Sequence, residues 1–256
     1  MLSFKVVIAN KPPKVLIIGK LTLKVSGKLS KTQLVTYNES STEDTLNVGG
    51  LCGVNSGSIV SCSVINVKFS SSFSDKNNDK AIYMNLGGLV GKTTGGSISS
   101  CSVSYCNFTG QMPCAENSGD DAYGSFGGIV GYNSYAISSS SFTNNTVYIR
   151  VYCDGKYKLG SNNNAYPNAY VGGIVGWNIS GTVSSATAKS NSYTVIQSYG
   201  AYTFPTFYTG YVVGRLDGGS DSSPTVSSNT MYCKTGDDSL TWYTYVNDGA
   251  SVYKKK

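Results

Sequence analysis

The chain contains 256 residues, of which 13% are charged, 20 are tyrosines, 30 are glycines and none is a histidine. The absence of histidine excludes a Ser-His-Asp triad and any imidazole metal site. The low charge, together with many Tyr, Val, Ile and Thr residues, favours β-strands and argues against a disordered chain.

Residues 1–45 are predicted to form basic N-terminal strands that cap the rest of the chain. Residues 1–31 hold seven of the 20 basic side chains and none of the 14 acidic ones, so the remainder is close to neutral. Residues 21–25 alternate as Leu-Thr-Leu-Lys-Val, which is typical of a half-buried strand. The lysines are interpreted either as charges that protect an edge strand or as a site for an anionic partner. A third interpretation is a strand that docks on a neighbouring subunit.

A glycine-rich motif recurs through residues 46–235 and marks the units of an internal repeat. Its best copies read Gly-Gly-Leu/Ile-Val-Gly. The first glycines of all five copies, at positions 49, 87, 127, 172 and 210, lie 38, 40, 45 and 38 residues apart. Repetition at such a period indicates a solenoid or a related array. The motif residues expected to build the scaffold are Gly50, Leu51, Gly53, Gly88, Leu89, Gly91, Gly128, Ile129, Gly131, Gly173, Ile174, Gly176, Val212 and Gly214.

Each unit contains two further apolar segments and then a polar stretch of variable length. Residues 57–64 read GSIVSCSV and residues 96–103 read GSISSCSV, and a shorter apolar segment follows each. Apolar segments of this length, separated by Gly, Asn and Ser, predict three short strands per unit. We therefore predict an all-β fold, a β-solenoid (β-helix) of about five coils, with residues 236–256 as a C-terminal strand or tail.

Equivalent residues of successive units are expected to stack into ladders inside the solenoid. One ladder contains Leu51, Leu89, Ile129, Ile174 and Val212, and a second contains Ile59, Ile98, Ile137 and Val183. In the fifth unit the second ladder is assigned to Val226. The motif glycines are expected to adopt positive φ angles and to let adjacent coils approach closely.

The motif, followed two residues later by Asn and then by Gly-x-Ile and a Cys or Ser, resembles the GLUG repeat. Asn55, Asn133 and Asn178 occupy the Asn position, and Thr93 replaces it in the second unit. The resemblance covers about residues 46–233. It implies a scaffold repeat of large cell-surface proteins, including adhesins and the non-catalytic parts of bacterial immunoglobulin A peptidases, and it implies no particular ligand.

Two of the seven cysteines, Cys62 and Cys101, occupy the same position in adjacent units. Neighbouring strands lie ~4.8 Å apart and disulfides accept Cα separations of ~4.4–6.8 Å, so a bridge between them is allowed. The alternative is an inert ladder of buried thiols. Cys106, Cys114 and Cys153 are placed in or near the variable loops, where a disulfide would restrain loop positions.

The tyrosines concentrate in the second half of the chain and have two interpretations. They are either strand formers on an exposed face or a surface that stacks on sugars and other partners. The sequence favours a non-enzymatic structural or adhesive solenoid of the cell surface, and a narrower version of this prediction is a self-assembling subunit of an extracellular filament or sheath. The alternatives are a carbohydrate-binding or carbohydrate-cleaving β-helix and an intracellular scaffold.

The expected partners are a second copy of the chain or a surface glycan, and no metal or cofactor is expected. Few basic residues occur in the repeats, which argues against nucleic acid, and no apolar run reaches the ~18 residues of a membrane span. The expected location is extracellular or at the cell surface, although the first residues do not form a recognisable signal peptide.

Overall fold

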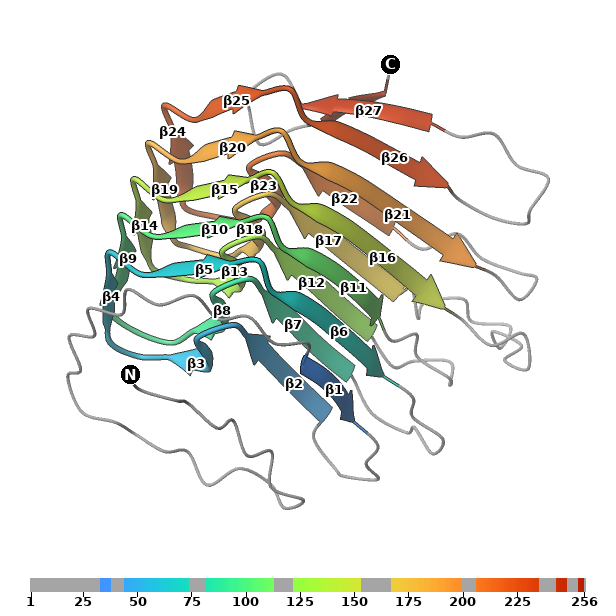
Figure 1. Ribbon diagram of the computed structural model, residues 1–256, viewed down its shortest axis with the longest axis horizontal. Coiled ribbons are helices and arrows are strands. Elements are labelled where there is room, and N and C mark those ends of the chain that lie inside the picture. The colour runs from blue at the N-terminus through green and yellow to red at the C-terminus, as the bar shows by residue number, and fades with distance from the viewer. Residues whose placement is uncertain are drawn as a thin grey trace.

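The computed structural model describes residues 33–37, 44–73, 82–112, 122–152, 167–198, 206–234, 243–247 and 253–255, and these contain β-strands and turns with no helix. Successive units stack in parallel, so each strand pairs with the equivalent strand of the next unit (Figure 1). The prediction of an all-β solenoid is confirmed. Each of four sheets contains one strand from each of five units.

Each unit has five strands, and the prediction of three was wrong. Sheet B contains β2 (Asp44–Gly49), β7 (Ile82–Gly87), β12 (Ala122–Gly127), β17 (Pro167–Gly172) and β22 (Thr206–Gly210). Sheet C contains β3 (Cys52–Asn55), β8 (Val90–Thr93), β13 (Val130–Asn133), β18 (Val175–Asn178) and β23 (Val213–Leu216). Sheet D contains β4 (Ser58–Val60), β9 (Ser97–Ser99), β14 (Ala136–Ser138), β19 (Thr182–Ser184) and β24 (Ser220–Ser222). Sheet E contains β5 (Ser63–Ile65), β10 (Ser102–Ser104), β15 (Ser141–Thr143), β20 (Thr187–Lys189) and β25 (Thr225–Ser227).

Sheet A completes each unit and extends beyond the repeats at both ends. It contains β1 (Gln33–Tyr37), β6 (Lys68–Phe73), β11 (Asn107–Met112), β16 (Thr146–Tyr152), β21 (Ser192–Ser198), β26 (Thr230–Lys234), β27 (Tyr243–Asn247) and β28 (Tyr253–Lys255). Strand β1 pairs in parallel with β6, whereas β27 and β28 are antiparallel to their neighbours. The predicted cap of residues 1–45 otherwise lies largely outside the described residues.

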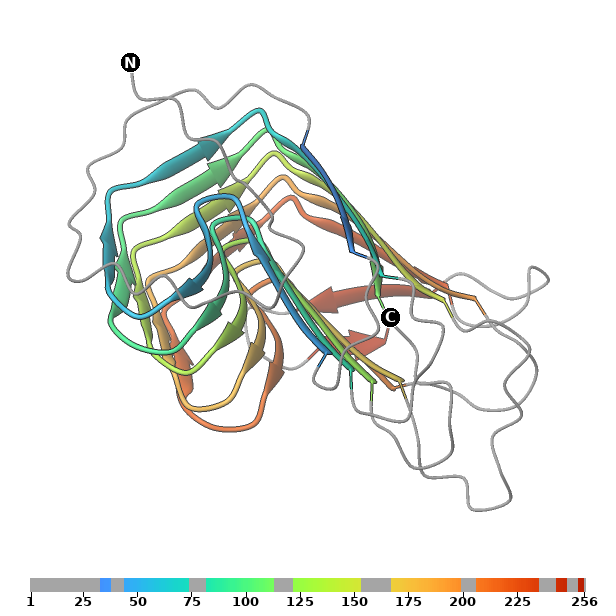
Figure 2. The same cartoon turned by 90° about the horizontal axis from the view of Figure 1, so that it is seen from below.

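Each unit encloses a core with two regions (Figure 2). Sheets C, D and E surround one region, and sheets A and B extend from it as two facing arms. Between the arms, Phe108 of sheet A packs edge-on against Phe126 of sheet B, with ring centroids 5.2 Å apart. Within sheet A, Phe69 stacks on Phe108 of the next unit at 4.5 Å. Burial of these rings supplies a large part of the hydrophobic stabilisation.

The two predicted apolar ladders are present in the core. Leu89, Ile129, Ile174 and Val212 are fully buried, and Leu51 packs against them at the N-terminal end. Ile59, Ile98, Ile137 and Val183 pair in register in sheet D and are also buried. The assignment of Val226 to this second ladder was wrong, because Val183 pairs with Asp221, while Val226 pairs with Ala188 in sheet E.

The motif glycines allow sheets B and C to pack with their backbones in close contact. A Cβ atom on Gly91 would lie 2.6 Å from the backbone nitrogen of Val48, and one on Gly131 would lie 2.7 Å from that of Leu86. The second glycine of the motif, such as Gly88, lies against the carbonyl oxygen of Gly128 in the next unit. The expectation of close approach is therefore confirmed. The expectation of positive φ angles was wrong, since among the described glycines these occur at Gly96 and Gly219, outside the motif.

Candidate functional site: corner ladders, aromatic residues and the loop-bearing edge

The corner between sheets C and D is held by a ladder of buried polar side chains. Thr93 donates its hydroxyl hydrogen to Oδ1 of Asn133 (2.9 Å), and Nδ2 of Asn133 donates to Oδ1 of Asn178 (2.9 Å). Nδ2 of Asn178 then donates to the carbonyl oxygen of Gly181 (2.8 Å). The Asn position of the repeat is thus a structural position, in which the side chains satisfy buried polar groups that the turn leaves without strand partners.

A second ladder connects the units at the corner between sheets E and A. The backbone nitrogen of Cys106 donates to Oδ1 of Asn145 (2.8 Å), that of Asn145 donates to Asn191 (3.0 Å), and that of Asn191 donates to Asn229 (2.9 Å). Nδ2 of Asn191 also donates to the carbonyl oxygen of Phe142 (2.8 Å). Each side chain therefore bridges to the unit before it in the chain.

Cys62 and Cys101 belong to a third ladder, at the corner between sheets D and E. The backbone nitrogen of Cys62 donates to Sγ of Cys101 (3.4 Å), and that of Cys101 donates to Oγ of Ser140 (3.2 Å). Both cysteines are free thiols, which matches the buried-ladder alternative. Burial raises the pKa of the Cys101 thiol, although backbone hydrogen bonds oppose this effect in part. In this ladder the thiol of Cys101 accepts the same kind of hydrogen bond as the hydroxyl of Ser140 in the next unit.

Cys106 was wrongly placed near the variable loops, because its side chain is fully buried in the second ladder. Its pKa is raised as well, with burial as the main cause. Cys114 and Cys153 lie outside the described residues. Together with the geometry of Cys62 and Cys101, this assigns three of the cysteines to the scaffold.

Left-handed residues form the turns just before two of these ladders. Ser61, Ser100, Ser139, Ser185 and Ser223 have φ angles of 47–55° at the corner between sheets D and E. Asn66, Tyr105, Asn144, Ser190 and Ser228 have φ angles of 55–56° at the corner between sheets E and A. Serine and tyrosine are not typical of positive φ, so most of these turns could not be recognised from their residue types.

A cluster of aromatic rings joins sheets B and C. Tyr83 stacks on Tyr123 (5.1 Å between centroids), and Tyr123 stacks on Trp177 (5.4 Å). Tyr132 meets Trp177 edge-on at 5.3 Å, and Tyr170 lies 4.8 Å from it. The rings therefore bury much of their surface against one another and form a small hydrophobic cluster separate from the main core.

Arg215 closes this aromatic cluster at the C-terminal end. Its Nε atom donates to Oδ1 of Asp217 (2.6 Å), and Nη1 donates to the hydroxyl of Tyr170 (2.9 Å). Nε1 of Trp177 donates to the second oxygen of Asp217 (2.7 Å). The guanidinium also lies 4.9 Å from the ring centre of Tyr208. Burial raises the pKa of Tyr170 well above its ordinary value, against the opposing effect of Arg215.

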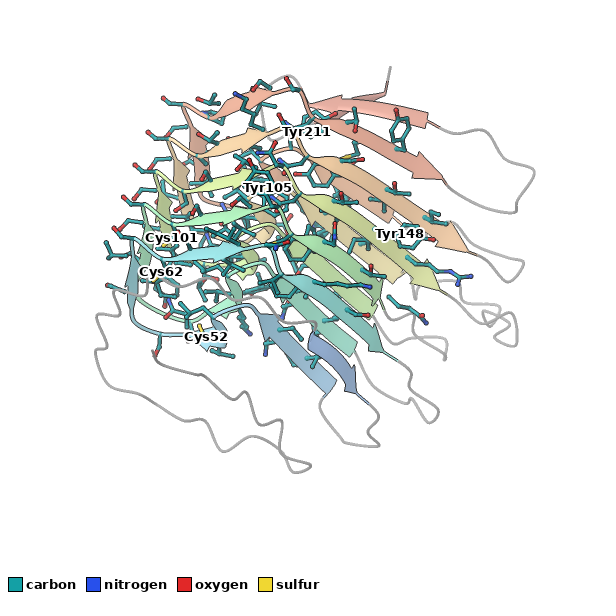
Figure 3. All side chains as sticks on the ribbon, in the orientation of Figure 1. Cys52, Cys62, Cys101, Tyr105, Tyr148 and Tyr211 are labelled. Atoms are coloured by element: carbon teal, nitrogen blue, oxygen red, sulfur yellow. The ribbon has the colours of Figure 1, made fainter. Side chains whose placement is uncertain are left out.

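The structure divides the tyrosines into buried, clustered and exposed groups. Tyr170, Tyr193 and Tyr211 are buried, so neither sequence interpretation describes them. The most exposed described tyrosines are Tyr105 and Tyr135 at corners, and Tyr148 and Tyr232 on sheet A. Figure 3 shows Tyr148 on β16 and Tyr211 among the inner side chains. Spacing along the sequence did not distinguish these groups, because the outer and inner faces alternate within one strand.

Variation in the length of the units is concentrated at one edge of the solenoid. Five segments connect a sheet A strand to the next sheet B strand, namely residues 38–43, 74–81, 113–121, 153–166 and 199–205. Their lengths run from six to 14 residues, whereas every turn inside the units has two or three. The two arms therefore end in the variable segments of every unit, so the anchor points of these segments form a row.

Among the described side chains, no group of three or more His, Cys, Asp or Glu residues is arranged to hold a metal ion. In the same part of the chain, no helix is long and apolar enough to cross a membrane.

Comparison with protein families agrees with the geometry of the repeat. Residues 82–111 match the model of the GLUG motif, and this range runs from β7 to β11, which is one complete unit. The chain is therefore a β-solenoid that contains a GLUG motif, as the resemblance predicted. No curated protein and no solved structure matches the chain.

Proposed function

We propose that this chain is a non-enzymatic β-solenoid that acts as a structural or adhesive element at the cell surface. The observation that carries the proposal is that the recurring residues build the scaffold, whereas the segments of variable length are not part of it. The recurring glycines allow close backbone packing, and the recurring Asn, Ser and Cys side chains form hydrogen bonds in the corner ladders. The segments that vary in length all leave one edge of a rigid scaffold, which is a common arrangement for recognition loops.

Replacement of the variable segments tests this proposal. Residues 113–121 and 153–166 are exchanged, together, for Gly/Ser linkers of equal length, and beads coated with the protein are tested for attachment to cell surfaces. We expect loss of attachment with an unchanged β-sheet circular dichroism spectrum and melting temperature. Attachment equal to that of the original chain, or turnover of a polysaccharide in a reducing-sugar assay, would contradict the proposal.

Self-assembly into a filament is a narrower version of the same proposal. It is supported by the edges of sheets B to E, which end on β2 to β5 at one end and on β22 to β25 at the other among the described strands. One feature opposes it: Asp221 places a carboxylate at a core position of the terminal strand β24. An inward charge of this kind disfavours continuation of the sheet by another chain.

A further inference from the structure

The outer face of sheet A is built from in-register parallel strands of successive units. Along its strands, buried and outward side chains alternate, so Thr146, Tyr148 and Arg150 of β16 all face outward. In-register pairing sets the outward residues of successive units in columns. One column contains Thr109, Tyr148, Thr194 and Tyr232 in that order.

Two tyrosine rings stand on this column with a threonine between them. Tyr148 is 38% exposed and Tyr232 is 44% exposed, and each pairs in register with Thr194. Two strand spacings separate them, which is roughly 10 Å. The disaccharide repeat of an extended β-1,4-linked glycan has a similar length, so alternate sugar rings could lie over the two tyrosines.

These rings differ from the aromatic cluster of sheets B and C. Tyr123 and Trp177 stack on each other, and Arg215 lies 5.9 Å from the ring centre of Trp177. Tyr148 and Tyr232, by contrast, make no ring contact with the other described aromatic side chains. An aromatic ring that is exposed and held on a rigid strand is well suited to stack on the apolar face of a sugar.

Two basic side chains lie on this face. Among the residues of β6, β11, β16, β21 and β26 whose side chains the structure describes, the charged ones are Lys68 and Arg150, and none is Asp or Glu. Lys68 and Arg150 are exposed on the outer face. A positive surface on an otherwise nearly neutral body favours an anionic ligand.

We propose that the outer face of sheet A binds an extended acidic polysaccharide. Tyr148 and Tyr232 stack on its sugar rings, Lys68 and Arg150 attract its carboxylates, and Thr194 between the two tyrosines forms a hydrogen bond to one of its hydroxyls. The proposal shares with the proposed function the premise that the ligand is held and not cleaved. It does not depend on the variable segments, so the two can fail separately.

Affinity electrophoresis with two cellulose derivatives tests the proposal. Carboxymethylcellulose and hydroxyethylcellulose share a backbone and differ in charge, so retardation should be stronger by the first and should weaken with salt. The double variant Tyr148→Ala/Tyr232→Ala should bind carboxymethylcellulose about tenfold more weakly or worse. Tyr148→Phe should bind like the original chain, because the ring is kept.

Two controls make the result specific. Tyr135→Ala removes a tyrosine of similar exposure, 39%, from a corner away from sheet A, and it should not change binding. Lys68→Gln/Arg150→Gln should abolish the difference between the two polymers. Normal binding by the double tyrosine variant, or equal binding of both polymers by the original chain, overturns the proposal. It is also overturned if that variant alters the oligomeric state in light scattering and leaves polysaccharide binding unchanged.

Discussion

The backbone nitrogen of Asn145 donates a hydrogen bond of 3.0 Å to Oδ1 of Asn191, which is 46 residues further along the chain. Both asparagines are about 1% exposed. The bond joins the third and fourth units at a turn where the backbone has left one sheet and not yet entered the next. Stacked units are thus held together by side chains at the corners as well as by the sheets.

Substitution Asn191→Ala is expected to lower the free energy of unfolding by about 2–4 kcal/mol, because buried polar groups of Asn145 and Phe142 lose their partners. Denaturant unfolding measures the change. The neighbouring variant Ser192→Ala, at an exposed position, should change stability by less than about 0.5 kcal/mol. Equal effects of the two substitutions would show that the ladder does not contribute.

Substitution Gly131→Ala is expected to lower the free energy of unfolding by about 1–3 kcal/mol, through overlap with backbone atoms of Leu86 and Gly91. Gly57 is a matched control, because a Cβ atom there meets nothing within 4 Å and its φ is not left-handed. Gly57→Ala should be neutral or stabilise by up to about 1 kcal/mol. Thermal unfolding of the two variants in parallel is the measurement, and similar melting temperatures would contradict the packing of sheets B and C.

The repeat in the sequence predicted the stacking of units but not the number of strands in each unit. The period of the Gly-Gly motif predicted a parallel solenoid and its apolar ladders, because stacking of equal units follows from repetition alone. It did not predict five strands per unit, since the extra corners are formed by serine and tyrosine in left-handed conformations such as Ser100 and Tyr105. The exposed tyrosines of sheet A could be separated from Tyr170 and Tyr193 only once the faces of the strands were known.

Substitution Tyr105→Asn is expected to raise the free energy of unfolding by a few tenths to about 1 kcal/mol. Tyr105 has a φ of 55° and is 62% exposed, so it bears the cost of a left-handed conformation and gains little from burial. The comparison is Tyr148→Asn, within a strand, which should not stabilise. Chemical denaturation decides, and a loss of stability in the first variant would contradict the assigned turn.

Substitution Asp221→Val is expected to raise the free energy of unfolding by about 1 kcal/mol or more, since Oδ2 of Asp221 is buried without a hydrogen-bond partner below Val183. Asp221→Asn, which keeps a polar group at the same place, should gain less. Because the carboxylate disfavours pairing of another chain with the edge of sheet D, the valine variant should also self-associate more readily, which light scattering measures. Unchanged stability and a monomeric valine variant would contradict the role assigned to Asp221.

The buried thiols predict a loss of stability at alkaline pH. Burial raises the pKa of Cys52 from 9.0 to about 11 and also raises those of Cys101 and Cys106. The unfolded chain therefore loses these protons first, so the contribution of the thiols to stability is constant below pH about 9 and falls as the pH rises toward about 11. Denaturant unfolding at pH 8 and pH 10.5 measures the fall, which Cys52→Ala should reduce. A free energy of unfolding that is equal at pH 8 and pH 10.5 would contradict the burial of these thiols.

Thiol counting separates the extracellular from the intracellular alternative. Unfolded under non-reducing conditions, protein from its native source should release fewer than seven reactive thiols if any disulfide has formed, and all seven if the cysteines are reduced. Persistent disulfides favour the cell-surface function, because they form in oxidising compartments. Seven free thiols would favour the intracellular alternative instead.

The central claim is that equivalent residues of successive units stack in register, since the proposed binding face and the loop-bearing edge both depend on it. Val60, Ser99, Ser138, Ser184 and Ser222 form one outward column of sheet D. Spin labels at residues 60 and 222 should lie roughly 19 Å apart at the backbone, and moving the first label to 99 and then to 138 should shorten this distance by ~4.8 Å each time. Pulsed electron paramagnetic resonance distances that change by unequal steps, or that do not shorten, would contradict the stack.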